Sequence, residues 1–139
     1  FLKKIDHKRF NFYLDPSIKI HKVSNFKSKI FWANYSSKMY RKVDLSIVKP
    51  GLGTINDCLQ YAIPIISYSK LFNKEFKFNS KILTDNKLGW SVKNFSSIPE
   101  KIDEIMKNKN LLNNYYLKCK KLKWGGENIF KREIKMVSI

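Results

Sequence analysis

Short apolar runs of strand length alternate with amphipathic helical patterns along this sequence, and that alternation restricts the fold more than any other feature. The expected strands are Phe10–Leu14, Ile18–Val23, Asp44–Val48, Pro64–Ser67 and Trp90–Val92. The expected helices are Ser36–Lys42 (within a mixed stretch, Lys29–Val43), Thr54–Ala62, Glu75–Leu88, one opening at Ser97–Glu100, Asn110–Leu122 and Glu127–Val137. Such a β/α alternation is typical of a doubly wound parallel sheet with helices on both faces. The sequence therefore predicts an α/β, Rossmann-like fold.

Two of the expected helices have capping signals at their ends. Gly89 stands just after the helix that ends at Leu88, where a glycine commonly closes a helix. Ser97 is placed to cap the next helix, with Glu100 completing a capping box and Pro99 in the first turn. The buried stripe of that helix is expected to consist of Ile98, Ile102 and Ile105.

The length and composition fit one domain, residues 1–139, in which 43% of the residues are hydrophobic. The longest apolar run, Ala62–Ile66, is far shorter than a membrane span. The chain opens at Phe1 without an initiating Met, and we expect it to be an N-terminally truncated piece of a longer protein. We expect a cytoplasmic location.

The cysteines and histidines give no sign of a metal centre. Cys58 and Cys119 lie far apart in the sequence, and neither has a second cysteine or a histidine at metal-ligand spacing. Cys58 falls on the apolar face of its helix, which predicts a buried, reduced thiol. His7 and His21 also lack acidic or cysteine partners at such a spacing. No metal and no cofactor are therefore expected.

The net charge of +17 invites a nucleic-acid-binding interpretation, but the residue types argue against it. Of the 28 basic residues, 25 are Lys and 3 are Arg, and they are spread along the whole chain. Recognition of bases and phosphates favours the bidentate guanidinium of Arg. We therefore expect no nucleic-acid partner. Attraction to an anionic lipid surface remains an expected consequence of the charge.

The strongest local signal is a strand, a glycine-containing turn and a helix in immediate succession. The expected tight loop is Lys49–Gly53, with the helix starting at Thr54. Gly51 and Gly53 remove side chains where the backbone must bend or where a ligand must approach closely. The N-terminus of a helix that follows a parallel strand favours anions, and a diphosphate is the expected guest. The pattern lacks the Gly-Lys-Ser/Thr of a Walker A loop.

Each of these features also has a purely structural interpretation. The glycines alone are compatible with a plain tight turn. Thr54 and Asp57 are spaced almost as in a capping box, so that both would serve only the start of the helix. Glu75 and Asn79 lie one helical turn apart and could be a solvated pair.

The stretch from Asp44 to Ser67 resembles the C-terminal domain of GT-B glycosyltransferases. The similar group includes the bacterial peptidoglycan N-acetylglucosaminyltransferase and plant monogalactosyldiacylglycerol synthase. The shared features, in sequence order, are Asp44, an apolar strand, Lys49, the glycine-rich turn, Thr54, a carboxylate at Asp57 where the family has Glu, and Pro64. The family then has Glu-Gln-x-x-Asn, an apolar helix and a Gly, which correspond here to Glu75, Phe76, Asn79 and Gly89. Phe76 in place of Gln and Ala62 in place of Gly are departures.

The resemblance implies the C-terminal half of a GT-B fold and roles for its matching residues. The donor diphosphate of a nucleotide-sugar, expected to be a UDP-sugar, would lie against Lys49, Pro50, Gly51, Leu52, Gly53 and Thr54. Asp57 would bind the ribose hydroxyls, because a carboxylate can accept two hydrogen bonds. Glu75 and Asn79 would face the donor sugar. The acceptor site and the catalytic base would belong to a missing N-terminal domain, so that the catalytic residue is unknown and this piece alone is inactive.

The function that this implies is donor binding in an inverting hexosyltransferase that acts on a lipid-linked or cell-envelope acceptor, at the inner face of the plasma membrane. Two alternatives remain open. One is a non-catalytic subunit of a two-chain glycosyltransferase. The other is a sugar-nucleotide epimerase or hydrolase built on the same scaffold, which would need an acid or base of its own.

Overall fold

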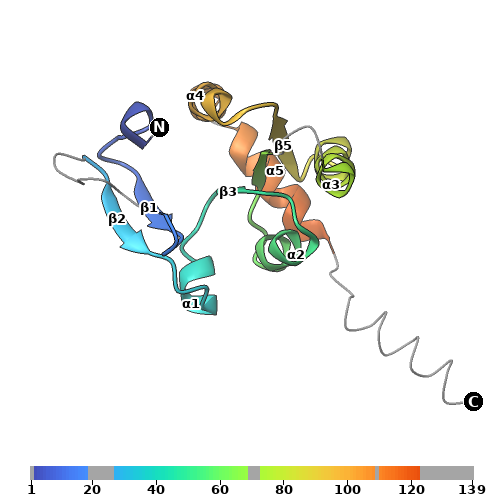
Figure 1. The fold of residues 1–139 in the computed structure, drawn as a ribbon, viewed down its shortest axis with the longest axis horizontal. Helices are drawn as coiled ribbons and strands as arrows, with labels where there is room; N and C mark the ends of the chain where they lie inside the picture. Colours follow the sequence, from blue (N-terminus) through green and yellow to red (C-terminus); the bar gives the residue numbers. More distant parts are fainter. Residues whose placement is uncertain (1, 19–26, 69–72, 109, 123–139) are drawn as a thin grey trace, which may run out of the picture.

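A computed structural model describes residues 2–18, 27–68, 73–108 and 110–122 (Figure 1). The strands in these ranges are β1 (Asn11–Leu14), β2 (Lys29–Trp32), β3 (Ser46–Val48), β4 (Ile65–Tyr68) and β5 (Gly89–Val92). The α-helices are α1 (Ser37–Tyr40), α2 (Leu52–Gln60), α3 (Lys74–Asp85), α4 (Ile98–Lys107) and α5 (Leu111–Lys121). Two 3-10 turns, η1 (Leu2–Lys4) and η2 (Phe95–Ser97), complete the described elements.

Every strand pairing in the described part of the chain is parallel, as the β/α alternation predicts. β1 pairs with β2 in a two-stranded sheet, and Asn11 lies opposite Lys29. A three-stranded sheet has the order β3-β4-β5, in which Ile65 of the central strand lies opposite both Ser46 and Gly89. The α/β, Rossmann-like prediction is therefore confirmed, with the strands divided between two sheets.

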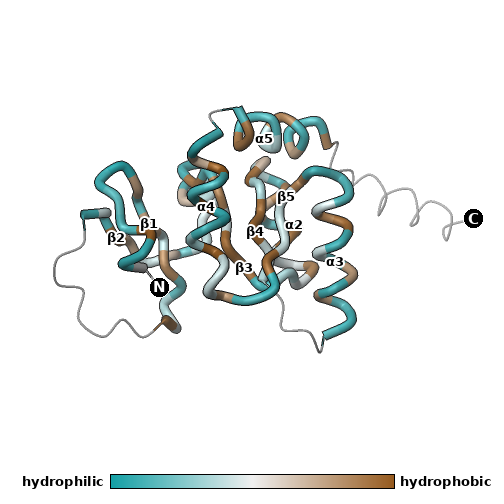
Figure 2. Tube along the Cα trace, turned by 90° about the horizontal axis from the view of Figure 1, so that it is seen from above, coloured by the Kyte–Doolittle hydropathy of each residue, from teal (hydrophilic) through white to brown (hydrophobic). Residues whose placement is uncertain are grey.

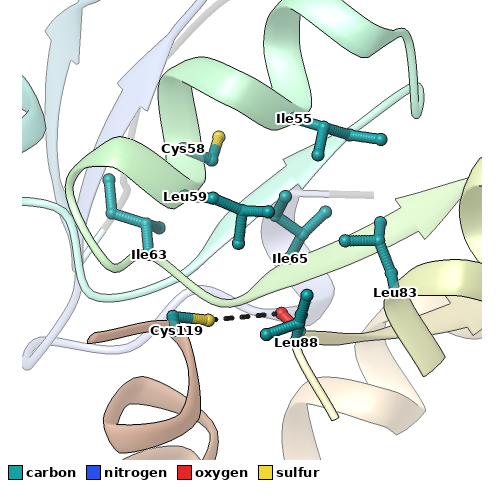
Figure 3. Packing of buried hydrophobic residues seen from close by; sticks show 8 residues of the cluster. All are labelled: Ile55, Cys58, Leu59, Ile63, Ile65, Leu83, Leu88 and Cys119. Carbon is teal, nitrogen blue, oxygen red and sulfur yellow. Dashed lines mark hydrogen bonds between the residues drawn. The ribbon is translucent and has the colours of Figure 1, made fainter. Parts of the chain in front are cut away.

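Helices cover both faces of the three-stranded sheet, with α4 on one side and α2 and α3 on the other (Figure 2). Successive strand residues point to opposite faces, and the fully buried neighbours Ile65 and Ile66 of β4 accordingly belong to different core clusters. Ile65 packs with residues of α2 and α3 (Figure 3), whereas Ile66 packs with residues of α4. Full burial of one such side chain contributes roughly 1.5–3 kcal/mol. The longest apolar run of the sequence, Ala62–Ile66, accordingly leads into the central strand.

The α4 face confirms the expected apolar stripe of that helix. Ile98, Ile102 and Ile105 are 0%, 7% and 2% exposed. From α5, the ring of Tyr115 stacks on Trp90 of β5 with 4.0 Å between the ring centroids. The two helices therefore share one apolar cluster on this side of the sheet.

The mixed stretch Lys29–Val43 contains strand β2 as well as helix α1, and the sequence did not predict that strand. The expected strand Ile18–Val23 lies outside the described residues except at Ile18, and the expected helix Glu127–Val137 lies entirely outside them.

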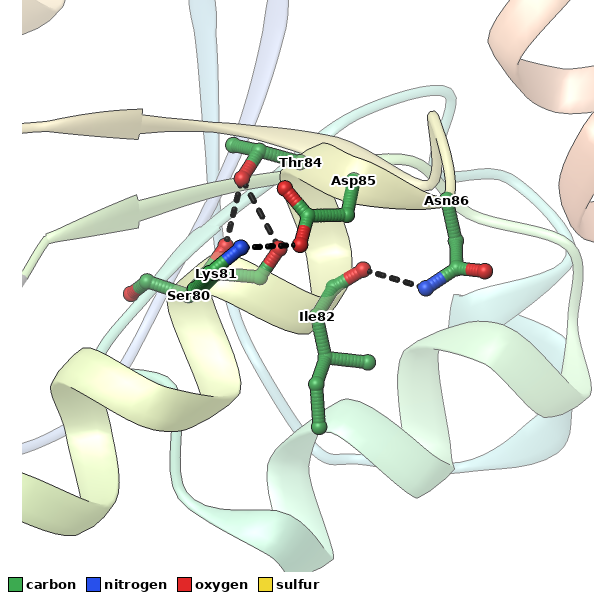
Figure 4. Close-up of polar contacts among 6 residues, drawn as sticks. All are labelled: Ser80, Lys81, Ile82, Thr84, Asp85 and Asn86. Carbon is green, nitrogen blue, oxygen red and sulfur yellow. Dashed lines mark hydrogen bonds and ion pairs between the residues drawn. The ribbon is translucent and has the colours of Figure 1, made fainter.

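Gly89 does not close helix α3 as predicted. The helix ends at Asp85, where Asn86 donates from its side-chain amide to the carbonyl of Ile82 at 2.8 Å (Figure 4). Lys87, with φ 56°, adopts the left-handed conformation that was expected of the glycine. Gly89 instead begins β5, and a Cβ built on it would lie 2.1 Å from the carbonyl oxygen of Ile65. Its lack of a side chain thus serves the close approach of two strands.

The predicted capping box at Ser97 is also wrong, although Pro99 does occupy the first turn of α4. Ser97 has helical backbone angles (φ −85°, ψ −6°) and makes no side-chain cap hydrogen bond, because the turn η2 leads directly into α4. Asn94 caps that turn instead, accepting from the backbone N–H of Ser97 at 3.0 Å.

Both cysteines are buried, as expected for Cys58, and their thiols should be unreactive in the folded protein. Burial raises the pKa of both thiols, that of Cys119 to about 11. Two pKa units correspond to about a hundred-fold less thiolate. We expect iodoacetamide at pH 8 to label Cys119 at least about a hundred-fold more slowly in buffer than in urea, as followed by mass spectrometry. Equal labelling rates in buffer and in urea would show that the core cluster around Cys58 and Cys119 opens readily.

Candidate functional site

The turn between β3 and α2 is shorter than the sequence predicts. α2 begins at Leu52 and not at Thr54, so that the loop is Lys49–Gly51 and Gly53 is helical. The backbone N–H of Gly51 donates to the carbonyl of Lys49 at 2.9 Å, which closes a tight turn around the buried Pro50. The predicted boundary is wrong because glycine commonly marks a loop, whereas here it stands in the first turn of a helix, which tolerates it.

Helix α3 contacts this turn through Phe76 and Asn79. The side-chain amide of Asn79 donates to the carbonyl oxygen of Pro50 at 2.8 Å, across 29 positions of the sequence, and Asn79 is 9% exposed. Phe76, one turn earlier, places a ring carbon 3.9 Å from where a Cβ of Gly51 would lie. The resemblance marked Phe76 only as a departure from the family pattern. In the structure it supports the turn together with Asn79.

The two glycines of the turn are not required by its backbone conformation. Neither has a positive φ: Gly51 is extended (φ −72°, ψ 146°), and Gly53 lies in the helix. No described heavy atom other than those of its chain neighbours and its own helix backbone lies within 4 Å of a Cβ built on Gly53. Bending of the chain therefore does not explain these glycines. Close approach of a ligand remains a candidate role for Gly53, where the space for a side chain is open.

The N-terminus of α2 differs from that of α3 in having no built-in anionic or capping partner. Gly51 provides no side-chain cap, and the first turn contains no acidic residue. In α3, by contrast, Asn73 accepts from the N–H of Phe76 and Glu75 stands in the first turn. The first N–H groups of a helix have no partner within the helix and carry partial positive charge. The start of α2, with the exposed Lys49 just before it, is therefore suited to an anion.

The capping-box interpretation of Thr54 and Asp57 is contradicted. Gly51 is the N-cap, Thr54 is the third residue of α2, and Asp57 is the sixth, beyond the first turn. Asp57 is exposed and lies four residues after Gly53, which places both on one face of the helix. The opposite face contributes Ile55, Cys58 and Leu59 to the core. Gly53 and Asp57 thus form an open, solvent-facing strip that starts at the N-terminus of α2.

Glu75 and Asn79 share one face of α3, but they are not a solvated pair. Glu75 is exposed in the first turn, whereas Asn79 is buried and bonded to Pro50. Asn79 faces the turn, and Glu75 lies on the same side of α3, one helical turn closer to the N-terminus of that helix. The structure thus brings the turn and Asn79 into direct contact. Among the described residues, no hydrogen bond or ion pair joins the side chain of Asp57 or Glu75 to the turn.

No metal centre is found where the structure describes the chain. Residues 2–18, 27–68, 73–108 and 110–122 contain no group of three His, Cys, Asp or Glu side chains that could hold an ion. The Nδ1 atom of His7 accepts from the backbone N–H of Arg9 at 3.2 Å, and His21 lies outside these ranges. No described helix is long and apolar enough to cross a membrane.

Comparison with known proteins identifies the fold. No protein-family model matches the sequence, and no curated protein matches it. Among solved structures, the glycotransferase of kitacinnamycin superposes with a TM-score of 0.54 at 8% sequence identity, over 79% of this chain and 30% of that one. The chain has a glycosyltransferase-like fold. Identity this low shows the fold alone, and the chain spans less than a third of the length of that structure.

Proposed function

We propose that this chain is the nucleotide-sugar donor-binding part of an inverting glycosyltransferase, with a UDP-sugar as donor. The observation that carries the proposal is the uncapped N-terminus of α2, which continues into the open strip of Gly53 and Asp57. The glycosyltransferase-like fold supports it. So does the order of these residues, which resembles that of GT-B enzymes.

We place a diphosphate joined to a ribose along this strip. The diphosphate would accept hydrogen bonds from the N–H groups of Leu52, Gly53 and Thr54, with Lys49 supplying charge beside them. Asp57 follows Gly53 by four residues, about 6 Å along the helix axis at 1.5 Å per residue. Its side chain leans back toward the N-terminus, as helical side chains do. A ribose attached to the diphosphate would meet that carboxylate with its hydroxyl groups.

The donor sugar would extend toward α3. Glu75, exposed in the first turn of that helix, would accept hydrogen bonds from the sugar hydroxyls. Asn79 would fix the turn through Pro50 and offer the sugar its remaining carbonyl oxygen. The alternative roles, a helix-start acid at Glu75 and a purely structural amide at Asn79, predict no change in donor preference when either is replaced.

The rest of the reaction requires groups from elsewhere. We assign the acceptor site and the catalytic base to an N-terminal domain, as the resemblance to GT-B enzymes implies. The matched stretch is 30% of the glycotransferase of kitacinnamycin, which is consistent with a longer parent protein. The proposed acceptor is lipid-linked or part of the cell envelope, and the proposed location is the inner face of the plasma membrane. If incubation of the full-length protein with a UDP-sugar alone releases free sugar or an epimer, the hydrolase or epimerase alternative replaces this proposal.

Donor binding can be tested by titrating UDP and UDP-sugars into the full-length protein while following backbone amide shifts by NMR. The shifts should begin at the amides of Leu52, Gly53 and Thr54, because these are the proposed phosphate donors. Saturable shifts elsewhere, with this turn unchanged, would overturn the proposed site. If the chain is instead part of a non-catalytic subunit, the full-length protein will bind the UDP-sugar but will transfer no sugar, whichever domains it is combined with.

Asp57→Asn should separate ligand binding from folding. Because Asp57 lies beyond the first turn of α2, it is not a cap, and we expect the unfolding free energy to change by less than about 0.5 kcal/mol. The amide keeps one acceptor but loses the charge-assisted pair of hydrogen bonds, each typically worth about 1.5–3 kcal/mol. We expect donor affinity to fall about ten-fold or more, as measured by calorimetric titration. Equal affinities would remove the ribose role.

A further inference from the structure

A basic surface lies on η1 and at the amino ends of β1 and β2, and it shares no residue with the proposed donor site. It is defined by six exposed basic side chains: Lys3, Lys4, Lys8, Arg9, Lys27 and Lys29. We name this set the amino-end basic patch, because its members lie on η1, just before β1, or at and just before the start of β2. Figure 1 shows η1 close to the amino ends of these two strands.

Hydrogen bonds hold the two halves of this patch together across about twenty positions of sequence. The carboxylate of Asp6 accepts from the backbone N–H groups of Lys27 and Ser28 at 2.7 and 2.8 Å. The backbone N–H of His7 donates to the hydroxyl of Ser28 at 3.0 Å, and that hydroxyl donates back to the carbonyl of His7 at 2.8 Å. Residues 3–9 and 27–29 are thereby fixed side by side.

The patch is not neutralised by its one carboxylate. Asp6 is the only acidic residue in segments 3–9 and 27–29, and its oxygens are occupied by two backbone N–H groups. Burial would raise the pKa of Asp6, but the hydrogen bonds from Lys27 and Ser28 outweigh it and hold the pKa below its usual value. The ion pairs in the described part of the chain are Lys81–Asp85 and Lys101–Glu104, and neither touches the patch. Five lysines and an arginine therefore face solvent around one internally bonded acid.

An exposed aromatic ring lies on the same strand face as Lys29 of the patch. Phe31 is two residues after Lys29 on β2, so both point to the same face of the sheet, and Phe31 remains 43% exposed although it stacks on Tyr13 at 5.2 Å. Clustered lysines attract anionic headgroups, and an adjacent apolar ring can enter the headgroup region. Nucleic-acid recognition favours Arg, and here Lys exceeds Arg by five to one.

We propose that the amino-end basic patch, with Phe31, docks the protein on an anionic phospholipid surface. The choice of a membrane over another polyanion rests on the proposed function, whose acceptor is lipid-linked. The docking itself needs no nucleotide. It would hold the donor-binding domain at the bilayer while leaving Lys49–Asp57 free for the donor.

The test is cosedimentation of the full-length protein with phosphatidylcholine vesicles that contain about 30% of the anionic lipid phosphatidylglycerol, because anionic headgroups attract basic side chains. The patch variant combines Lys8→Gln, Arg9→Gln, Lys27→Gln and Lys29→Gln, none of which removes a backbone group bonded to Asp6. At about 1 kcal/mol per basic residue near the surface, the partition coefficient should fall about a hundred-fold or more. Thermal unfolding checks that the variant is folded.

A control variant with the same net charge isolates the patch from the overall charge. It carries Lys107→Gln, Lys118→Gln, Lys120→Gln and Lys121→Gln on the exposed ends of α4 and α5. We expect it to lose less than about ten-fold, since charges beyond one Debye length are screened. Equal losses of vesicle binding in both variants would overturn the proposed role of the patch. So would tighter binding of duplex RNA than of vesicles at equal phosphate concentration. UDP titration of the patch variant should match wild type, so that failure of donor binding and failure of docking are told apart.

Discussion

Gly89→Ala should destabilise the fold by about 3 kcal/mol, the upper part of the range for forcing extra atoms into a packed interior. The new Cβ would lie 2.1 Å from the carbonyl oxygen of Ile65 and 3.0 Å from its carbonyl carbon. Both atoms belong to the backbone of β4, whose Ile65 is fully buried. A flexible side chain could move aside, but this backbone can yield only if β5 separates from β4. Urea unfolding of wild type and variant measures the difference.

Gly53→Ala is the matched control for that substitution, because it adds the same methyl group with the opposite expected sign. At Gly53 the added Cβ meets no described atom within 4 Å apart from the chain neighbours and the helix's own backbone, and alanine favours the helix. We expect a stabilisation of about 0.5–1 kcal/mol. If Gly89→Ala costs less than about 1 kcal/mol, the close approach of β4 and β5 at this register is wrong.

Sequence patterns predict some strands of this fold better than others. The strands β3, β4 and β5 could be predicted from short apolar signals. The central strand β4 begins with the fully buried Ile65 and Ile66, as expected of a strand covered on both faces. Strand β5 alternates buried Trp90 and Val92 with exposed Ser91.

Strand β2 was harder to predict, although Ile30, Phe31 and Trp32 form a β-prone apolar run. This run does not alternate between apolar and polar residues as a half-buried strand does, and it stands in a stretch that also contains helix α1.

Glycine had three different meanings in this chain, and the sequence could not separate them. Gly51 is a helix N-cap, Gly53 is helical, and Gly89 permits two backbones to approach. The left-handed position after α3 is taken by Lys87, not by the glycine two residues later. Local patterns report that a side chain is missing, but only the packing of neighbouring elements shows which atoms need the space.

The candidate turn could be located from sequence, but its support could not. A strand followed at once by a glycine-containing segment and a helix is a local signal, and it predicted the correct place. The bond from Asn79 to Pro50 joins residues 29 positions apart, so no local pattern reveals it. The resemblance selected Asn79 as a donor-sugar residue without indicating that its amide holds the turn. The two roles are compatible, because the carbonyl oxygen of Asn79 remains an acceptor.

Gly53→Leu should separate folding from donor binding more sharply than any other single change. Leucine is a better helix former than glycine, so we expect a stabilisation of about 0.5–1 kcal/mol. Its side chain would lean toward the N-terminus of α2 and cover the N–H groups proposed to hold the diphosphate. Loss of two hydrogen bonds to a charged ligand, at about 1.5–3 kcal/mol each, corresponds to at least about a hundred-fold weaker binding of UDP.

Gln60→Leu provides the control, because Gln60 is exposed on α2, lies at the far end of the helix from Gly53, and receives the same side chain. Its donor affinity should equal that of wild type. Calorimetric titration of UDP and thermal unfolding of the three full-length proteins give both quantities for each. A Gly53→Leu protein that is more stable and still binds UDP with wild-type affinity would contradict the phosphate cradle, because misfolding could not account for the result. If affinity falls while stability rises, the missing side chain at Gly53 serves the ligand and not the fold.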